Sequence, residues 1–125
     1  MEHRDMAVVF VELGIFSRDR RALGLTDEDL WALQRAILLG PESAPVIAGT
    51  GGLRKMRFAP PSWRTGKSGA LRVCYAWFPA HGRVVLVRAY AKARQADLAP
   101  AERVAIARLL AEIERGFGKR TGGRT

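Results

Sequence analysis

Residues 70–91 read ALRVCYAWFPAHGRVVLVRAYA, two runs rich in β-branched and aromatic residues on either side of Pro79-Ala80-His81-Gly82. Such runs are typical of strands, and a four-residue connection containing Gly is an acceptable hairpin loop. The stretch predicts two adjacent antiparallel strands, at 70–78 and 83–91. We expect the other elements to pack around this hairpin.

A third strand is predicted at 53–59 (LRKMRFA), before a basic, irregular loop that leads to the hairpin. Its side chains alternate, with Met56 and Phe58 on one face and Lys55 and Arg57 on the other. We expect the apolar face to join the core and the basic face to remain in solvent.

The N-terminal part of the chain predicts a strand at 6–13, a short helix at 16–23 and a longer helix at 27–39. Apolar residues recur at helical spacing in the longer helix. Thr26 is its expected N-cap, and three acidic residues follow at the positive end of the helix dipole.

A last helix is predicted at about 98–115, with Asp97 as its cap, Pro100 in its first turn and Gly116 at its end. The element order predicts an α+β domain over residues 1–115, followed by a basic flexible tail at 116–125. The sheet is expected to be mostly antiparallel and partly mixed, with about four strands, two N-terminal helices and one C-terminal helix. One face should pack against helices and the other should be free.

Positive charge is concentrated in the middle of the sequence. Residues 51–94 hold ten Lys and Arg and no Asp or Glu, whereas residues 1–50 hold five basic and eight acidic residues. Cations without local carboxylates attract polyanions such as nucleic acid. A solvated basic surface is the simpler alternative, but the clustering favours a binding surface.

Other classes of protein are disfavoured by composition. The sequence has no apolar run long enough to span a membrane, and its charged start lacks the order of a signal peptide. The only cysteine, Cys74, can form neither an internal disulfide nor a zinc site by itself. We expect a cytoplasmic protein without a cofactor, a metal or a membrane partner.

The candidate anion-binding residues begin with Lys55 and Arg57, which a strand would project about 7 Å apart in one direction. Arg72 on the next strand adds a third cation. Trp63, in the basic loop, is the aromatic residue best placed to stack on a base. We expect Trp31 and Trp77 to serve in packing, whereas for Tyr75 a core role and a functional role stay open.

Four segments together resemble the HigB-type branch of the RelE/ParE toxin superfamily. They cover most of the predicted folded region and read LTDEDLWALQRAILLGPE (25–42), VIAGTGGLRKMRFA (46–59), GKSGALRVCYAW (66–77) and RVVLVRAYAKARQADLAPAE (83–102). The resemblance implies a RelE-like fold and the toxin of a type II toxin-antitoxin system. It further implies a metal-independent endoribonuclease that cleaves mRNA, on the ribosome, by attack of the RNA's own 2′-hydroxyl.

Site residues are carried over from this resemblance one by one. Lys55 and Arg57 match the family's paired basic strand residues, and Arg72 matches the arginine that contacts the scissile phosphate. Lys92 fits the family's Tyr-x-Lys pattern, with Tyr90 as its tyrosine. The family's aromatic acid or base in the final helix has no counterpart here. Tyr90, or a lysine with a lowered pKa, is the candidate substitute, and the expected RNA-binding residues are Arg54, Trp63, Arg64, Lys67 and Arg94.

The resemblance also implies partners: a cognate antitoxin, for which a helix-turn-helix protein is the candidate, together with mRNA and the ribosome. Two alternatives stay open at this point. A ParE-like gyrase inhibitor would share the fold without the basic catalytic set, and a basic RNA-binding or ribosome-associated module would share the charge without cleavage.

Overall fold

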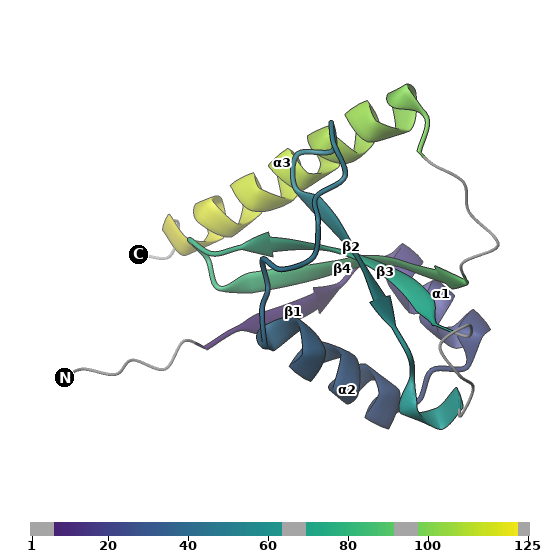
Figure 1. Cartoon of the computed structure of the whole chain (residues 1–125). Coiled ribbons are helices and arrows are strands. Elements are labelled where there is room, and N and C mark those ends of the chain that lie inside the picture. The colour runs from purple at the N-terminus through teal and green to yellow at the C-terminus, as the bar shows by residue number, and fades with distance from the viewer. Residues whose placement is uncertain (1–6, 64–69, 92–97, 123–125) are drawn as a thin grey trace.

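The computed structural model describes residues 7–63, 70–91 and 98–122, with side chains described as far as Gly118 (Figure 1). A four-stranded sheet lies between helices, so the predicted α+β fold with two N-terminal helices and one C-terminal helix is confirmed. The elements are β1 (Val9–Glu12), α1 (Gly14–Leu23), α2 (Asp27–Leu38), β2 (Leu53–Phe58), a short 3-10 helix η1 (Pro61–Trp63), β3 (Leu71–Phe78), β4 (Arg83–Ala91) and α3 (Pro100–Gly122).

The predicted hairpin forms the centre of the sheet. Its strands β3 and β4 pair antiparallel, β2 pairs antiparallel with β3, and β1 pairs parallel with β4, which gives the order β1-β4-β3-β2. Gly82 closes the hairpin loop at φ 62°, a left-handed conformation that favours glycine. The sheet is therefore mixed, with its parallel pair at one edge.

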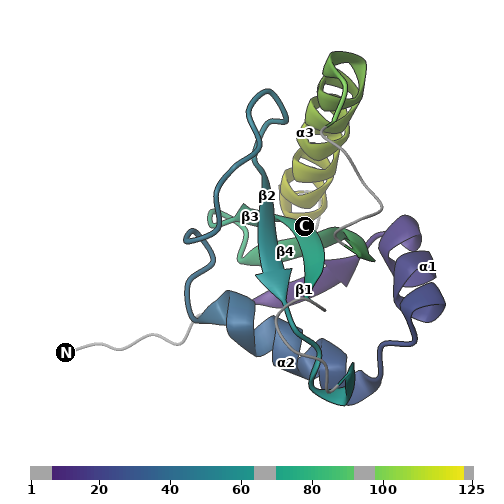
Figure 2. The same ribbon diagram turned by 45° about the vertical axis from the view of Figure 1, so that its right-hand side comes forward.

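Both faces of the sheet carry a hydrophobic core. On one face, Phe16 of α1 and Leu33 and Ile37 of α2 pack with strand residues such as Val73 and Tyr75. On the other face, α3 packs through Leu110 and its neighbours. Figures 1 and 2 show the sheet between α2 on one side and α3 on the other. The expectation of one wholly free face was therefore wrong, because the apolar stripe of α3 needs a sheet surface to cover it.

The last helix is longer than predicted. It continues past Gly116 to Gly122. Phe117 extends the apolar stripe by one turn and meets Phe78 edge to face, with ring centroids 5.7 Å apart. This aromatic contact outweighs the low helix propensity of glycine. The predicted helix end at Gly116 was therefore wrong, and so was the predicted flexible tail over residues 116–122. Asp97, the predicted cap of this helix, lies outside the described residues.

One aromatic residue expected in the core lies on the surface. Trp31 on α2 is 59% exposed, and the Arg35 guanidinium stacks 4.7 Å from its ring centroid. The prediction that Trp31 serves in packing was therefore wrong. Trp77 packs partly buried against the core, as predicted, and Tyr75 is buried with its hydroxyl donating to the Pro41 carbonyl.

A buried carboxylate fixes the start of α2. Thr26 caps the helix as predicted, and the Asp29 carboxylate accepts a hydrogen bond from the Thr26 N–H in return. The same carboxylate accepts from the backbone N–H and the hydroxyl of Ser62 in η1. Burial tends to raise the pKa of Asp29, but the hydrogen bonds from Ser62 and Thr26 outweigh it and lower that pKa. Asp29 thus joins α2 to the segment that follows β2.

We expect Asp29→Ala to lower the free energy of unfolding by about 2–4 kcal/mol at pH 7, because it removes a cap and leaves buried donors unpaired. Urea unfolding measures the loss. Because the pKa is lowered in the folded state, the stabilisation should be full above about pH 4 and vanish as the pH falls through the folded-state value. Ser62→Ala, which removes one hydroxyl donor, should cost about 1 kcal/mol. Equal stability of wild type and Asp29→Ala at pH 7 would contradict the anchoring role.

Candidate nucleic-acid interface

Cross-strand pairing brings the predicted cations together on the α3 side of the sheet. Arg57 of β2 lies directly opposite Arg72 of β3, and Arg72 lies directly opposite Tyr90 of β4. Directly opposite residues have Cβ atoms about 4.5–5.5 Å apart. Lys55 lies two residues from Arg57 on the same face, opposite Cys74. We call Lys55, Arg57, Arg72 and Tyr90 the basic row.

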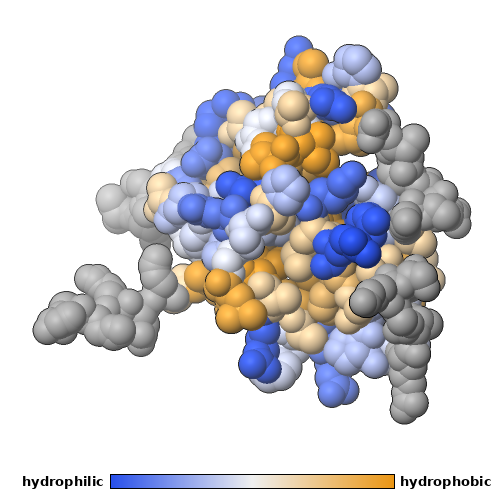
Figure 3. Space-filling view, viewed as in Figure 1, coloured by the Kyte–Doolittle hydropathy of each residue, from blue (hydrophilic) through white to orange (hydrophobic). Residues whose placement is uncertain are grey.

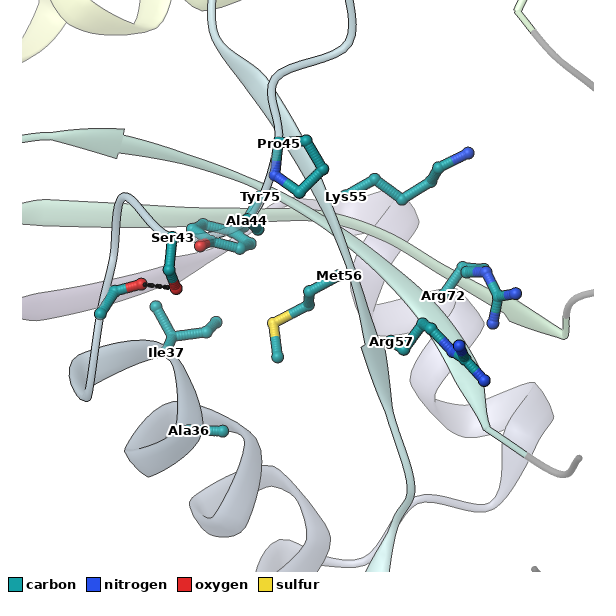
Figure 4. Close-up of a pocket in the computed structure, with 11 residues that line it drawn as sticks. Ala36, Ile37, Ser43, Ala44, Pro45, Lys55, Met56, Arg57, Arg72 and Tyr75 are labelled. Atoms are coloured by element: carbon teal, nitrogen blue, oxygen red, sulfur yellow. Dashed lines mark hydrogen bonds between the residues drawn. The ribbon is translucent and has the colours of Figure 1, made fainter. Parts of the chain in front are cut away.

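The pictures show the same arrangement. In Figure 4, the guanidinium groups of Arg57 and Arg72 lie side by side, Lys55 lies on the same side of β2, and Met56 points to the other side. Figure 3 shows strongly hydrophilic residues gathered over the middle of the sheet, between α3 above and α2 below. The cations therefore share one surface, as the sequence predicted.

A β-bulge in β4 places Tyr90 on this surface. The pairing of β3 with β4 shifts between Cys74 and Tyr75, so that Cys74 lies opposite Arg88 while Tyr75 lies opposite Leu86. Val87 is the extra residue. If the same residues alternated along a regular strand, Tyr90 would share the face of Val84 and Leu86, which belong to the α2 core.

An acidic residue of α1 holds the segment after the bulge. β1 pairs with β4 only as far as Leu86, which leaves the next part of the β4 edge open. There the Asp19 carboxylate accepts from the Ala89 N–H at 2.9 Å and from the Arg88 Nε at 2.7 Å. Asp19 thus neutralises Arg88 and fixes the backbone beside Tyr90. Sequence reasoning missed Arg88 and Asp19 as site neighbours because no local pattern signals the bulge.

Unlike Arg88, the cations of the basic row have no carboxylate partner within the described residues. Arg20, Arg88 and Arg115 each form an ion pair with a carboxylate, but Lys55, Arg57 and Arg72 do not. Arg57 is exposed, and Lys55 and Arg72 are half-buried. Like charges that face each other across strands destabilise a sheet unless an anion screens them. The row is therefore electrostatically suited to a phosphate group.

A cavity of about 440 Å³ adjoins these cations at the β2 edge of the sheet (Figure 4). The end of α2 and the segment Ser43–Pro45 form one wall, and Met56 and Tyr75 contribute apolar surface. Lys55, Arg57 and Arg72 also line it. A chain that lies across the basic row therefore has an open path on this side.

Tyr90 remains protonated at neutral pH. Burial raises its pKa to about 12, the neighbouring Cys74 thiol adds to this shift, and the cations Arg72 and Arg88 oppose it only in part. Burial likewise raises the pKa of Cys74. The Tyr90 hydroxyl is thus suited to donate a hydrogen bond or a proton. This argues against the general-base role considered from the sequence.

Several predicted site residues do not join the basic row. Arg54 is on the opposite side of β2, where its guanidinium donates to the carbonyls of Glu42 and Ala44. Trp63 belongs to η1, which packs against α2. Arg54 therefore has a structural role, whereas an RNA contact of Trp63 stays a prediction. Lys92, Arg64, Lys67 and Arg94 lie outside the described residues.

No protein-family model matches this chain. In the described part of the chain, no helix combines the length and apolar character needed to cross a membrane. The same residues contain no group of three or more His, Cys, Asp or Glu side chains placed to hold a metal ion.

The protonation of Tyr90 can be measured directly, because the chain contains two tyrosines. In a Tyr75→Phe variant we expect no more than about a tenth of the tyrosinate absorbance to develop below about pH 11 in the folded protein, with half-ionisation at about 12. The unfolded chain should titrate near about 10. Arg72→Ala in this background should raise the value further, because the cation favours tyrosinate. A folded-state midpoint near 10 would contradict the buried, neutral hydroxyl.

Proposed function

We propose that this protein is a type II toxin of the RelE/HigB kind, which binds RNA through the basic row and cleaves mRNA as an endoribonuclease. The observation that carries the proposal is the direct opposition of Arg57 and Arg72, with Tyr90 next in line and Lys55 beside them. The resemblance of four segments to that superfamily supports the same reading.

A phosphodiester is the anion that best fits the basic row. Arginine presents a planar fork of donors that matches two phosphate oxygens, and it stays charged at all accessible pH values. Two such forks on neighbouring strands can hold one phosphate, while Lys55 contacts the next oxygen or the next phosphate along the backbone. Such contacts fix the position of the chain without reading its bases.

The proposed chemistry uses the RNA's own 2′-hydroxyl. Its oxygen attacks the adjacent phosphorus, the bond from phosphorus to the 5′-oxygen breaks, and a 2′,3′-cyclic phosphate forms. Arg57 and Arg72 stabilise the extra negative charge of the pentavalent transition state. Tyr90 donates its proton to the departing 5′-oxygen, and the 2′-hydroxyl proton passes to water, from which Tyr90 is reprotonated.

The nearest carboxylates are already engaged, and this bears on the rate. Asp19 accepts from Arg88 and Ala89, and Glu102 accepts from the Ala99 N–H. His81 lies in the loop between β3 and β4, at the end of the hairpin away from Arg72 and Tyr90, and its Nε2 is 3.6 Å from Oε2 of Glu114. Among the described residues, Glu102 is the carboxylate that lines a cavity together with Lys55 and Tyr90, and its side chain is held at the start of α3 by the Ala99 N–H. We expect slow cleavage of free RNA and faster cleavage when the ribosome orients the substrate.

In a translating extract, the full chain should cleave mRNA, and Arg72→Ala should lower the cleavage rate by about 100-fold or more, as loss of one transition-state donor does elsewhere. Primer extension on the message measures the cuts. Arg35→Gln, which removes a cation from the opposite side of the sheet, is the charge-matched control and should retain full activity. Cleavage that persists unchanged in Arg72→Ala would refute this assignment of the site.

A non-catalytic RNA-binding module is the second candidate, favoured by the engagement of Asp19 and Glu102 in other hydrogen bonds. It predicts salt-dependent RNA binding that Arg72→Ala weakens, with no cleavage even on the ribosome. The ParE-like alternative predicts inhibition of DNA supercoiling instead, and the basic row argues against it. A cognate antitoxin of helix-turn-helix type is the proposed regulatory partner, and the cytoplasm is the proposed compartment.

A further inference from the structure

A second cavity, of about 310 Å³, lies between the sheet and the N-terminal half of α3. Its walls are mainly apolar, with Ile106 and Leu109 from α3, Ile15 from α1 and Val87 from the bulge. Ile15 and Leu109 are 40% and 42% exposed, so apolar surface borders its opening. This volume is at the lower end of the range for small-ligand pockets.

Three polar groups of this cavity lie where it meets the basic row, and Glu102 and Arg103 of α3 line it as well. Lys55, Arg88 and Tyr90 line it, and Lys55 also lines the cavity at the β2 edge. Arg88 is paired with Asp19, and Arg103 donates to the carbonyls of Leu98 and Ala48. Lys55 is therefore the cation at the junction that forms no ion pair within the described residues.

The basic row and this cavity thus form one continuous surface with two chemistries. An anion held by Arg57, Arg72 and Lys55 stands directly beside an apolar groove. A ligand that fits both parts carries a phosphate next to a flat, largely apolar group. A nucleotide has this composition, with its sugar joining the phosphate to the base.

We infer that the cavity under α3 is a nucleobase subsite, in which the base of the nucleotide whose 3′-phosphate lies on the basic row inserts between α3 and the sheet. This inference deepens the proposed function and rests on it. The groove contacts the base mainly through apolar side chains. Polar groups that line the same cavity, among them Glu102 of α3 and Tyr90 of β4, lie where they can form hydrogen bonds with the edge of the base.

The test is calorimetric titration of the full chain with three probes: inorganic phosphate, 3′-AMP and adenosine. We expect 3′-AMP to bind at least about tenfold more tightly than phosphate, because burial of the base adds to the phosphate contacts, and adenosine to bind weakly. Ala105→Trp fills the groove from an exposed lining position. It should abolish the advantage of 3′-AMP and leave phosphate affinity unchanged.

Ala111→Trp is the matched control, since Ala111 is exposed on α3 and does not line the cavity. It should retain the full advantage of 3′-AMP, and circular dichroism checks that both variants fold. Equal affinity for phosphate and 3′-AMP in the wild type would overturn the subsite while leaving the phosphate-binding row intact. In that outcome the groove would instead be a binding site for an apolar peptide segment. If neither phosphate nor 3′-AMP binds, or if Arg72→Ala leaves their affinities unchanged, the proposed function is overturned together with the subsite.

Discussion

Pairing between β3 and β4 shifts by one residue between Cys74 and Tyr75, and this shift decides what the open part of the sheet presents. Ahead of the bulge, Val84 and Leu86 face the α2 core while Val85 faces α3. Beyond it, the alternation is reversed, so Tyr90 faces the α3 side while Ala89 enters the α2 core. One extra residue thus lets a single strand fill two cores and still contribute a hydroxyl group to the basic row. A regular strand would have placed Tyr90 in the α2 core and left Arg72 without its neighbour.

The charges follow from how far α3 reaches along the sheet. It covers Leu53, Ala76 and Val85, where the strands present apolar side chains, and the sheet beyond presents cations instead. A helix packed over Arg57 and Arg72 would bury unpaired charge, at a cost of several kcal/mol per ion. Asp19 compensates the charge of Arg88 alone. It reaches the β4 edge because α1, which carries Asp19, begins where β1 ends. The uncompensated cations therefore lie where solvent, or a bound polyanion, can reach them.

Local signals in the sequence predicted the elements well, and their sheet partners less completely. Thr26 with its acidic first turn marks the start of α2 correctly, and alternation in β2 separates Lys55 and Arg57 from Met56 and Phe58. The same alternation should have excluded Arg54, which lies on the Met56 face and binds loop carbonyls. The bulge could not be predicted, since it depends on how two strands fit both cores at once. The end of α3 was misplaced because Gly116 is a local stop signal, whereas Phe117 meets Phe78 through a contact distant in sequence.

The surroundings of Tyr90 explain why a neutral hydroxyl group can lie in one row with cations. Arg72 and Arg88 favour tyrosinate, but burial and the adjacent Cys74 thiol disfavour it more strongly, so the phenol keeps its proton. A phosphate bound on Arg57 and Arg72 would offset part of the positive potential and raise the pKa of Tyr90 further. The proton would then leave only when stronger negative charge develops on a nearby oxygen, as it does on a departing 5′-oxygen. The packing of Tyr90 thus holds its hydroxyl neutral before any ligand arrives, which is what the proposed donor role requires.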